Sequence, residues 1–325
     1  MLVIGREDVQ KAITMRDAIE AIKRGFILFS QRKAVVPLRV PIKLRENTIL
    51  FMPGALLEDK SVGVKAVSVC PGNPERGLPL INAVVLLIDG ETGRPQALID
   101  GNIITTIRTG AAGGAAAEIL ARRDSKIALI IGAGVQGRIQ LEALKTVRDI
   151  ELAYVYDIND RKAEKYASEM AERLNTEVKA VKDYEKIISE ADIIVTATTS
   201  KDPVLKGNLL KKGAHINAIG SYTPEMKELD VDTFSRASII AVDSKDAVLE
   251  EAGEIIEALR RGIIREDALI ELGEILSNTE LGRKDESEIT VFKTVGIAVE
   301  DIVVGKLVYE RALEKGIGVE VKNFL

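Results

Sequence analysis

The sequence has little of what metal centres and disulfide-bonded folds require. Among its 325 residues there is one cysteine, one histidine and no tryptophan. One cysteine excludes an intrachain disulfide framework and a cysteine-rich zinc site, because both need several thiols. One histidine leaves no histidine cluster to bind a transition metal. We therefore expect a fold without disulfides and a site without a metal.

A basic excess and a long apolar run are also lacking. The chain carries 45 lysines and arginines against 50 acidic residues, a formal net charge of −5. Proteins that grip nucleic acids through the phosphates carry the opposite balance, so no nucleic-acid partner is expected. No apolar run approaches the roughly 20 residues that cross a bilayer, and the N-terminus shows no signal-peptide pattern. The expectation is a cytoplasmic protein without a membrane partner.

The first third of the chain has the pattern of helices followed by a sheet. Residues 1–30 show the apolar spacing of two short helices, and Thr14 followed by Asp17 predicts a capping box. Short β-rich runs follow without long helices between them, which predicts an antiparallel or mixed sheet. The predicted strands are 35–40, 48–52, 62–69 and 81–88, with a turn at 91–95.

From residue 126 onwards, strands and helices alternate. The predicted strands are 127–131, 152–156, 178–181, 193–197, 215–219 and 239–242. This alternation is typical of a doubly wound parallel sheet. Residues 294–315 read as one amphipathic helix that we expect to return to the first domain. The predicted fold class is α/β: a Rossmann-type doubly wound parallel sheet over 116–299, and a discontinuous α+β domain made of 1–115 and 300–325.

A glycine motif joins the first strand of the predicted parallel sheet to its helix. Gly132, Gly134 and Gly137 form Gly-x-Gly-x-x-Gly at this junction, with Val135 and Gln136 inside the motif. In dinucleotide-binding folds the first glycine allows the tight turn, the second admits the pyrophosphate and the third lets the helix pack on the strand. The free N–H groups of the helix start attract the phosphates. The motif in this context predicts a bound dinucleotide.

The choice between the two nicotinamide cofactors depends on the end of the next strand. Asp157 lies 20 residues after Gly137, the spacing at which an acidic side chain binds ribose hydroxyls. Its charge would repel a 2′-phosphate, so NAD(H) is favoured. Asn159 and Arg161 lie close by and keep NADP(H) possible.

Three cations stand where a small anionic ligand could use them. Arg39 lies in a Pro-Leu-Arg-Val-Pro stretch, Lys65 inside an apolar strand, and Arg108 in Thr-Ile-Arg-Thr-Gly. Burying an unpaired ammonium is costly, so Lys65 needs a partner or a ligand. The alternative is a lysine at a strand edge with its ammonium in water. His215 begins an apolar strand, and we expect it to be structural.

Further motifs extend over nearly the whole chain. They are Gly63-Val64-Lys65, Pro71-Gly72-Asn73-Pro74, Gly77-Leu78-Pro79, Arg108-Thr109-Gly110-Ala111-Ala112, His215-Ile216-Asn217-Ala218-Ile219-Gly220, Glu228-Leu229-Asp230, Val291-Phe292-Lys293-Thr294-Val295-Gly296 and Glu300-Asp301. With the glycine loop, they make the chain resemble the ornithine cyclodeaminase/mu-crystallin family. Members similar to it include ornithine cyclodeaminases, alanine dehydrogenases and cyclic ketimine reductases, which pass through an imine or imino acid beside a nicotinamide.

The resemblance implies roles for individual residues. Arg39, Lys65 and Arg108 would hold the substrate carboxylate, and the first domain would bind substrate and pair through its sheet in a homodimer. Met52 and Tyr222 are expected to contact the substrate as well. The residues expected to contact the cofactor, besides the glycine loop and the 157–161 segment, are Arg108, Thr109, Ala197, Thr198, Thr199, Gly220, Ser221, Lys293 and Thr294. For 197–199 the alternative is an ordinary exit from a strand.

Two departures narrow the implied reaction. Leu50 stands where cyclodeaminases carry a glutamate, and Tyr222 where cyclodeaminases and archaeal alanine dehydrogenases carry an aspartate. Neither side chain shuttles protons near neutral pH, since a free phenol titrates near ~10. Phe292-Lys293-Thr294 also resembles the mu-crystallin branch, where ketimine reduction is known.

The sequence therefore predicts an NAD(P)H-dependent reductase of a cyclic ketimine carboxylate, with Δ1-pyrroline-2-carboxylate to L-proline as the leading hypothesis. Lys65 and Arg108 would be catalytic, with Lys65 or a water protonating the imine. Alanine dehydrogenase, ornithine cyclodeaminase and an NAD(P)-regulated binding protein like mu-crystallin stay as alternatives. The expected partner is a small imino- or amino-acid substrate.

Overall fold

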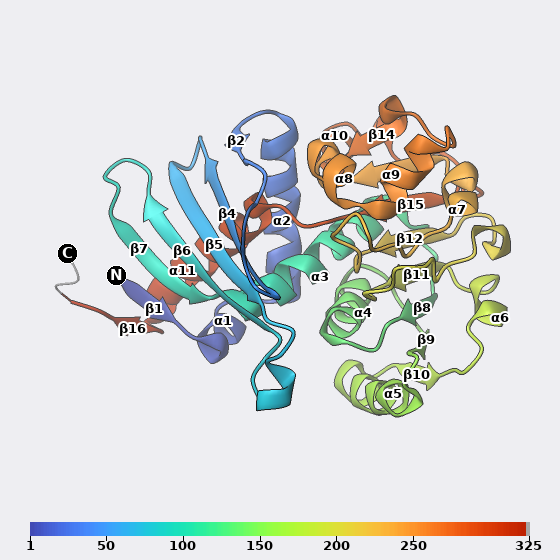
Figure 1. Cartoon of the computed structure of the whole chain (residues 1–325), viewed down its shortest axis with the longest axis horizontal. Coiled ribbons are helices and arrows are strands. Elements are labelled where there is room, and N and C mark those ends of the chain that lie inside the picture. Colours follow the sequence, from blue (N-terminus) through green and yellow to red (C-terminus); the bar gives the residue numbers. More distant parts are fainter. Residues whose placement is uncertain (323–325) are drawn as a thin grey trace. The chain divides into compact units, whose positions relative to one another are not determined.

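The computed structural model describes residues 1–322, which form two compact units (Figure 1). The first unit consists of residues 1–108 and the chain from 297 onwards, and the second of residues 109–296. Helix α3 (Gly101–Leu120) begins in the first unit and continues into the second. The sequence analysis places these boundaries at 115/116 and 299/300.

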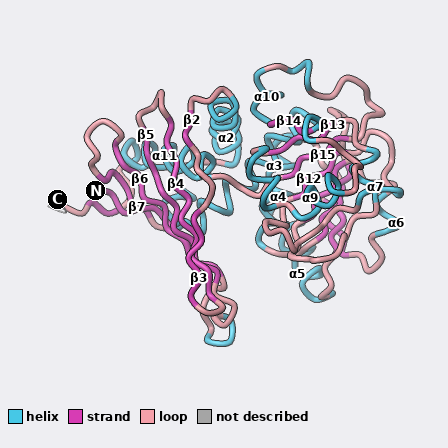
Figure 2. Tube along the Cα trace, turned by 45° about the horizontal axis from the view of Figure 1, so that its top comes forward, coloured by secondary structure: helices cyan, strands magenta, loops and turns pink. Residues whose placement is uncertain are grey.

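The first unit is built on a mixed sheet, as predicted. Its strand order is β16-β1-β7-β6-β5-β4-β2, and β3 pairs with β4. Neighbours are antiparallel except β1 and β7, which are parallel. The strands are β1 (Leu2–Ile4), β2 (Ala34–Val35), β3 (Val40–Leu44), β4 (Asn47–Leu56), β5 (Ser61–Val69), β6 (Ile81–Asp89), β7 (Pro95–Asp100) and β16 (Val319–Glu320). In Figure 2, β3 lies in the narrow part of the sheet that projects from the rest of it.

Helices cover one face of this sheet. They are α1 (Arg6–Ala12), α2 (Met15–Ser30) and α11 (Ala298–Lys315), and Thr14 and Asp17 form the predicted capping box of α2. Along β5 every second residue is buried from Ser61 to Val67, as expected for a strand with one covered face. A Cβ on Gly63 would lie 3.0 Å from Ile302 of α11. The glycine therefore lets the helix approach the sheet closely.

Several boundaries differ from the predictions. A strand expected at 35–40 is split into β2 and β3, because Pro37 interrupts the run between them. Strand β7, directly after the turn at 91–95, was not predicted. Helix α11 begins at Ala298 and not at 294, since Gly296 has a φ of +79° and the backbone N–H groups of Val295 and Gly296 donate to the Asp243 carboxylate.

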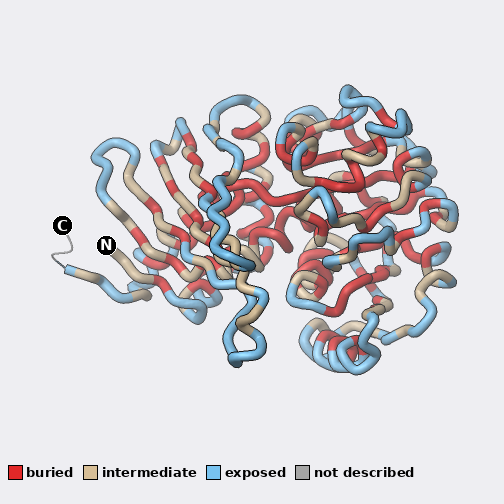
Figure 3. Tube along the Cα trace, in the orientation of Figure 1, coloured by how far each residue is buried: buried red, intermediate tan, exposed pale blue. Residues whose placement is uncertain are grey.

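The second unit is a doubly wound parallel sheet, as predicted. Its strand order is β10-β9-β8-β11-β12-β15-β13-β14, and every pairing is parallel. The strands are β8 (Ile127–Ile131), β9 (Leu152–Tyr156), β10 (Glu177–Ala180), β11 (Ile193–Thr196), β12 (His215–Ala218), β13 (Ile239–Val242), β14 (Leu269–Glu271) and β15 (Thr290–Lys293). Figure 3 shows these central strands as buried. The chain reverses its direction of travel across the sheet beside β8, where such folds bind ligands at the strand carboxyl ends.

The helices of the second unit connect successive strands. They are α4 (Val135–Val147), α5 (Asp160–Leu174), α6 (Glu185–Ile188), α7 (Val231–Arg236), α8 (Lys245–Glu251), α9 (Gly253–Arg260) and α10 (Leu272–Ser277). Between β8 and α5 the apolar core includes Leu141, Leu144, Tyr166 and Met170. No helix within residues 1–322 is long and apolar enough to span a membrane.

Candidate functional site

The glycine loop has the shape that a pyrophosphate needs. Gly132 has φ +110°, and a Cβ there would lie 2.4 Å from the carbonyl oxygen of Ala197. A Cβ on Gly137 would lie 2.1 Å from the carbonyl oxygen of Gly132, so helix α4 packs directly on the turn. Gly134, in contrast, has no atom within 4 Å of a Cβ position. The space beside Gly134 is the open side of the loop, at the N-terminus of α4 where an anion is favoured.

Groups around the loop fit the adenosine half of a dinucleotide. Asp157, after β9, accepts a hydrogen bond from the backbone N–H of Ala133 at 2.9 Å and another from that of Asn159 at 2.9 Å. Its carboxylate therefore has a fixed orientation. Ile158 is 93% exposed and Val135 63% exposed, which leaves apolar side chains at the outer edge of the loop. Ile158 was missed by the sequence analysis, which weighed only the polar residues of that segment.

The loops after β11 and β12 are tied together by a glutamate. Glu228 accepts hydrogen bonds from the backbone N–H and the hydroxyl of Thr198 (2.6 and 2.9 Å) and from the backbone N–H of Gly220 (2.7 Å). The side chain is fully buried, and this burial raises its pKa. The loops that contain Thr198, Gly220 and Ser221, all predicted to contact the cofactor, are therefore held together by the Glu228 side chain. Glu228 was noted as a motif but was given no role.

The two predicted cofactor residues at the end of β15 bind other parts of the protein. The Lys293 ammonium donates to the carbonyl and hydroxyl oxygens of Ser221 at 2.6 and 2.7 Å. Thr294 donates its hydroxyl to Asp243 at 2.6 Å. Both residues are buried. A direct contact of either with the cofactor stays a prediction.

The remaining predicted cofactor residues lie at different degrees of exposure. Thr109 is buried, and its carbonyl oxygen accepts a 2.7 Å bond from Gln140. Arg161 and Thr199 are exposed, and Ala197 is half-buried. The side-chain oxygen of Gln136 is buried without a hydrogen-bond partner in residues 1–322. A polar atom in that state at the start of α4 fits a site that gains a ligand.

In the first unit, Lys65 has the partner that its apolar strand requires. The side chain is 2% exposed, and its ammonium lies 2.7 Å from a carboxylate oxygen of Asp301. The alternative of an ammonium in water is therefore wrong. Burial lowers the pKa of Lys65 to about 8; the Asp301 charge opposes this shift and the Arg108 charge adds to it. A pKa of about 8 suits an amine for proton transfer near neutral pH; the catalytic role of Lys65 stays a prediction.

Arg108 belongs to the same cluster. It is 7% exposed, and it bonds Glu300 at 2.9 Å and lies 3.4 Å from Asp301. Both acids stand in the first turn of α11, which also places them at the positive end of that helix. Two cations and two carboxylates thus form one buried cluster, which we call the Lys65 cluster: Lys65, Arg108, Glu300 and Asp301. The acids were seen as a motif, but nothing in the sequence pairs them with residues some 190–240 positions away.

Two other predicted substrate residues lie in or next to the same sheet. Met52 is 4% exposed and pairs directly with Lys65 across β4 and β5. Arg39 is half-buried and directly precedes Val40, the first residue of β3, which pairs with Phe51 of β4. The structure thus joins Lys65 and Arg108 through Asp301, whereas Arg39 lies just before β3.

Tyr222 lies in the second unit, directly after Ser221, and is half-buried. His215 is fully buried there and bonds Thr290 and Asn217 at 2.9 and 3.0 Å. Its pKa is lowered to about 3, chiefly by burial, so the ring is neutral near pH 7. No group of three or more His, Cys, Asp or Glu side chains within the described residues could hold a metal ion.

The second unit has the strand order and glycine turn of the dinucleotide-binding α/β class, and the first adds a mixed sheet with buried cations. Comparison with known proteins defines the group more closely. The chain belongs to the ornithine cyclodeaminase/mu-crystallin family, whose model matches residues 1–316.

Individual relatives match over the full length. A Δ1-pyrroline-2-carboxylate reductase of Thermococcus litoralis, solved with NADH and L-proline, is 45% identical, with 99% and 100% of the two chains covered and a TM-score of 0.94. An archaeal alanine dehydrogenase, a dimer solved with NAD, is 37% identical, with 100% and 99% covered and a TM-score of 0.92. A Δ1-pyrroline-2-carboxylate reductase of Bacillus cereus is 39% identical over 99% of this chain and 100% of its own.

Proposed function

We propose that this protein reduces Δ1-pyrroline-2-carboxylate to L-proline with NADH. The observation that carries the proposal is the Lys65 cluster, a buried amine with a lowered pKa beside an arginine, in a chain whose other unit has an open glycine loop. The likeness to reductases of this imine supports the choice of substrate. The carboxylate of Asp157, fixed beside the loop, supports NADH over NADPH.

The reaction adds a hydride to the imine carbon and a proton to the imine nitrogen. The cofactor supplies the hydride from its nicotinamide. Lys65 donates the proton to the imine nitrogen, since an amine with a pKa of about 8 is mostly protonated at pH 7 and gives up the proton readily. Asp301 holds the ammonium in place before the transfer and favours its reprotonation from solvent afterwards.

The carboxylate of the substrate needs cations that are already oriented. Arg108 has its guanidinium fixed by Glu300, and Arg39, directly before β3, is the further predicted cation. Because the two acids neutralise the charge of the cluster before substrate arrives, the unliganded protein does not bury a net positive charge. Such preorganised positioning can supply up to ~7–11 kcal/mol in well-oriented reactions.

A panel of substrates tests the proposal. NADH oxidation is followed at 340 nm, the absorbance band of reduced nicotinamide, with Δ1-pyrroline-2-carboxylate, its six-membered homologue, pyruvate plus ammonia, and ornithine. We expect the five-membered imine to give the highest kcat/KM. The proposal fails if the imine is not reduced by either NADH or NADPH.

Alanine dehydrogenase is the second candidate, because the archaeal enzyme is nearly as similar in sequence and fold. Tyr222 argues against it, since a phenol does not replace a carboxylate in proton transfer near pH 7. Higher kcat/KM with pyruvate plus ammonia than with the imine would favour this candidate. Saturable ligand binding without any turnover would favour a binding protein like mu-crystallin, and turnover of ornithine a cyclodeaminase.

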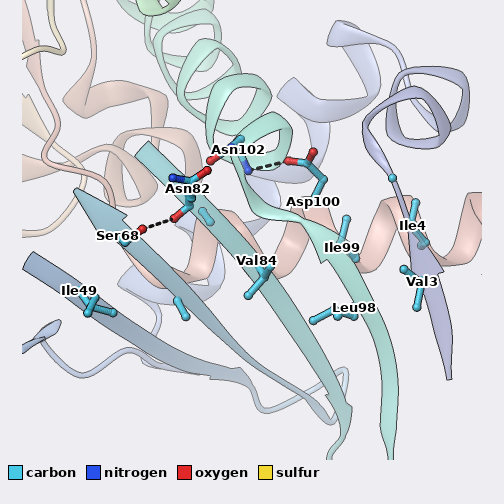
Figure 4. Close-up of a pocket in the computed structure, with 13 residues that line it drawn as sticks. Val3, Ile4, Ile49, Ser68, Asn82, Val84, Leu98, Ile99, Asp100 and Asn102 are labelled. Carbon is cyan, nitrogen blue, oxygen red and sulfur yellow. Dashed lines mark hydrogen bonds between the residues drawn. The ribbon is translucent and has the colours of Figure 1, made fainter. Parts of the chain in front are cut away.

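The homodimer is also a proposal, and it rests on the uncovered face of the first unit's sheet. This face exposes apolar side chains on neighbouring strands, which usually marks an interface. They include Val40, Ile42, Leu44, Phe51 and Val84, each 37–62% exposed. Beside them lies a hollow of about 540 Å³ whose lining includes Val3, Ile49, Val84 and Leu98 (Figure 4). The dimeric alanine dehydrogenase supports a second copy as the occupant.

Sedimentation velocity tests the dimer. Wild-type protein is expected to sediment as a dimer, and the Ile42→Glu/Val84→Glu double variant as a monomer, because charges would be buried in the interface. Leu313→Glu is the control, since Leu313 is 57% exposed on α11, away from this sheet face. A monomeric wild type would contradict the proposal.

A further inference from the structure

Lys293 is the most completely enclosed cation of the second unit's strand ends. Its side chain is 0% exposed, at the carboxyl end of β15. The ammonium bonds the carbonyl and hydroxyl oxygens of Ser221 and lies 3.4 Å from a carboxylate oxygen of Glu254, which is also buried. The mechanism above does not use this lysine. A buried ion pair is weak evidence for stability, so its presence calls for another explanation.

The lysine and the glutamate both bond one loop residue, Ser221. Ser221 donates its hydroxyl to Glu254 at 2.6 and 2.8 Å while accepting from Lys293. The carbonyl oxygen of the same residue accepts a second bond from the ammonium. Glu254 stands in the first turn of α9, so the cluster joins a helix, a strand end and the loop after β12.

The loop is fixed from its other side as well. Glu228 accepts from the backbone N–H groups of Gly220 and Ser221. A Cβ on Gly220 would lie 2.1 Å from the carbonyl oxygen of Thr198, so the two loops meet backbone to backbone. The backbone of 220–221 is therefore held by charged groups on both sides, which is far more than an ordinary surface loop receives.

The position of this loop suggests its purpose. In a doubly wound sheet the glycine turn and the acid of the second strand bind the adenosine half, and the other half of the dinucleotide lies at the carboxyl ends of the strands beyond the switch point. Here those strands are β11, β12 and β15, whose ends carry Thr198, Gly220 and Lys293. The held loop is thus where the nicotinamide ring would bind.

We propose that Lys293 and Glu254 are positioning residues that fix the Gly220-Ser221 loop as the support of the nicotinamide half, acting through Ser221 and without touching the cofactor. The inference builds on the proposed use of NADH and adds which residues orient the reactive ring. Lys293 must be a cation, since a neutral residue leaves Glu254 buried without its counter-charge, and the Ser221 hydroxyl then loses its fixed direction.

Ligand binding separates this role from simple stabilisation. The Lys293→Gln variant is compared with wild type for NADH by fluorescence titration and for ADP-ribose, which lacks the nicotinamide, by calorimetry. We expect NADH affinity to fall about tenfold, the scale of losing one hydrogen bond to a charged group. The affinity for ADP-ribose should stay unchanged. The kinetic isotope effect on kcat with deuterated NADH should rise, because hydride transfer becomes slower than the other steps.

Two conservative variants keep the test decisive if Lys293→Gln does not fold. Glu254→Gln and Ser221→Ala change few atoms and should show the same selective loss for NADH. Lys227→Gln is the matched control, since it removes another lysine–glutamate pair, in which Lys227 bonds Glu257 of α9. This variant should change the affinity for neither NADH nor ADP-ribose. Equal losses for NADH and ADP-ribose, or unchanged NADH affinity, would overturn the inference. Imine turnover by the wild type tests the proposed function independently of this inference.

Discussion

Lys65 and Lys293 are both buried, one in each unit, yet their ammonium groups are held in opposite ways. Lys65 stands in the middle of a strand and bonds a carboxylate that it shares with Arg108. Lys293 stands at a strand end and bonds two oxygens of one loop residue. The first arrangement is an ion cluster that contains two cations. In the second, the donors of the lysine are taken up by the carbonyl and hydroxyl oxygens of Ser221, with the Glu254 carboxylate 3.4 Å away.

This difference shows how a function can be assigned to a buried lysine. Burial lowers the pKa of Lys65 to about 8, and the charge of Arg108 adds to this shift although Asp301 opposes it, so the ammonium can give up its proton near neutral pH. Lys293, whose ammonium bonds two oxygens of Ser221 beside the Glu254 carboxylate, instead fixes the loop. Burial alone does not separate the two, because both side chains are at most 2% exposed. We therefore expect Lys65 to act on the substrate and Lys293 to help position the cofactor.

Replacing Lys65 gives the largest expected effect. Lys65→Ala removes the proton donor and one carboxylate-binding cation, so kcat/KM for the imine should fall about 10²–10³-fold, by analogy with loss of one oxyanion-stabilising donor. NADH affinity should not change. Steady-state kinetics and NADH titration check this, with Lys11→Ala, an exposed lysine of α1, as control. Near-normal turnover by the folded variant would refute the assignment.

Replacing Asp301 should shift the pH dependence and lower stability. In the wild type, Lys65 loses its proton above its pKa of about 8, so kcat/KM should fall as the pH rises through that value. Asp301→Asn removes the charge that opposes the lowering, so the pKa falls further and the alkaline limb moves to lower pH. Removing one partner of a buried pair should also cost about 3–5 kcal/mol in the free energy of unfolding.

The control for Asp301 lies on the same helix. Glu314→Gln removes an exposed ion pair of α11 with Arg311 and should leave both the pH profile and the stability nearly unchanged. An alkaline limb that stays in place in Asp301→Asn would show that Lys65 does not set the profile.

The sequence was sufficient for the parts of this comparison that depend on local pattern. The glycine turn, the parallel strands and the mixed sheet all follow from residues close together in the chain, and all were predicted. Lys65 was also identified, because a charge inside an apolar strand is conspicuous. Its partner was not, since Asp301 follows 236 positions later and only the packing of α11 on β5 brings the two together.

The function of Lys293 was harder to see for the same reason. The family resemblance implied a cofactor contact for it, and its place at the end of β15 fits that expectation. Which acceptors take its three protons depends on the loop after β12 and on α9, whose start was not predicted. Strand β3 shows a further limit: its residues are all exposed, so it has no alternation of buried and exposed residues to read.

Replacing Asp157 extends the comparison to the residue that would bind the adenosine half of the dinucleotide. We expect a smaller effect, on cofactor preference. Asp157→Asn keeps an acceptor for the N–H of Ala133 but removes the charge that repels a 2′-phosphate. The ratio of NADPH to NADH affinity should rise roughly tenfold, the scale of one hydrogen bond to a charged group, while KM for the imine stays unchanged. Titration with both cofactors measures the ratio. An unchanged ratio would mean that Asp157 does not discriminate between them.

His215 is a third buried titratable group, and it should have the smallest effect on activity. Its ring bonds Thr290 and Asn217 within the second unit and touches neither the glycine loop nor the Lys65 cluster. His215→Gln should therefore leave kcat/KM per folded molecule unchanged while lowering the unfolding free energy. If the variant lost activity without losing stability, burial would be a better guide to function than the bonded partner, and the distinction between Lys65 and Lys293 would weaken.

The pH dependence of that stability difference gives a sharper test. Because the pKa of His215 is about 3 in the folded protein and 6.5 when unfolded, the unfolded chain binds the extra proton between these values. The histidine's contribution is thus complete above pH 6.5 and is lost at up to ~1.4 kcal/mol per pH unit as the pH falls toward 3. Glutamine does not titrate, so denaturant unfolding should show the gap between wild type and His215→Gln narrowing from pH 7 to 5. A constant gap would mean that the pKa of the ring is the same in the folded and the unfolded protein.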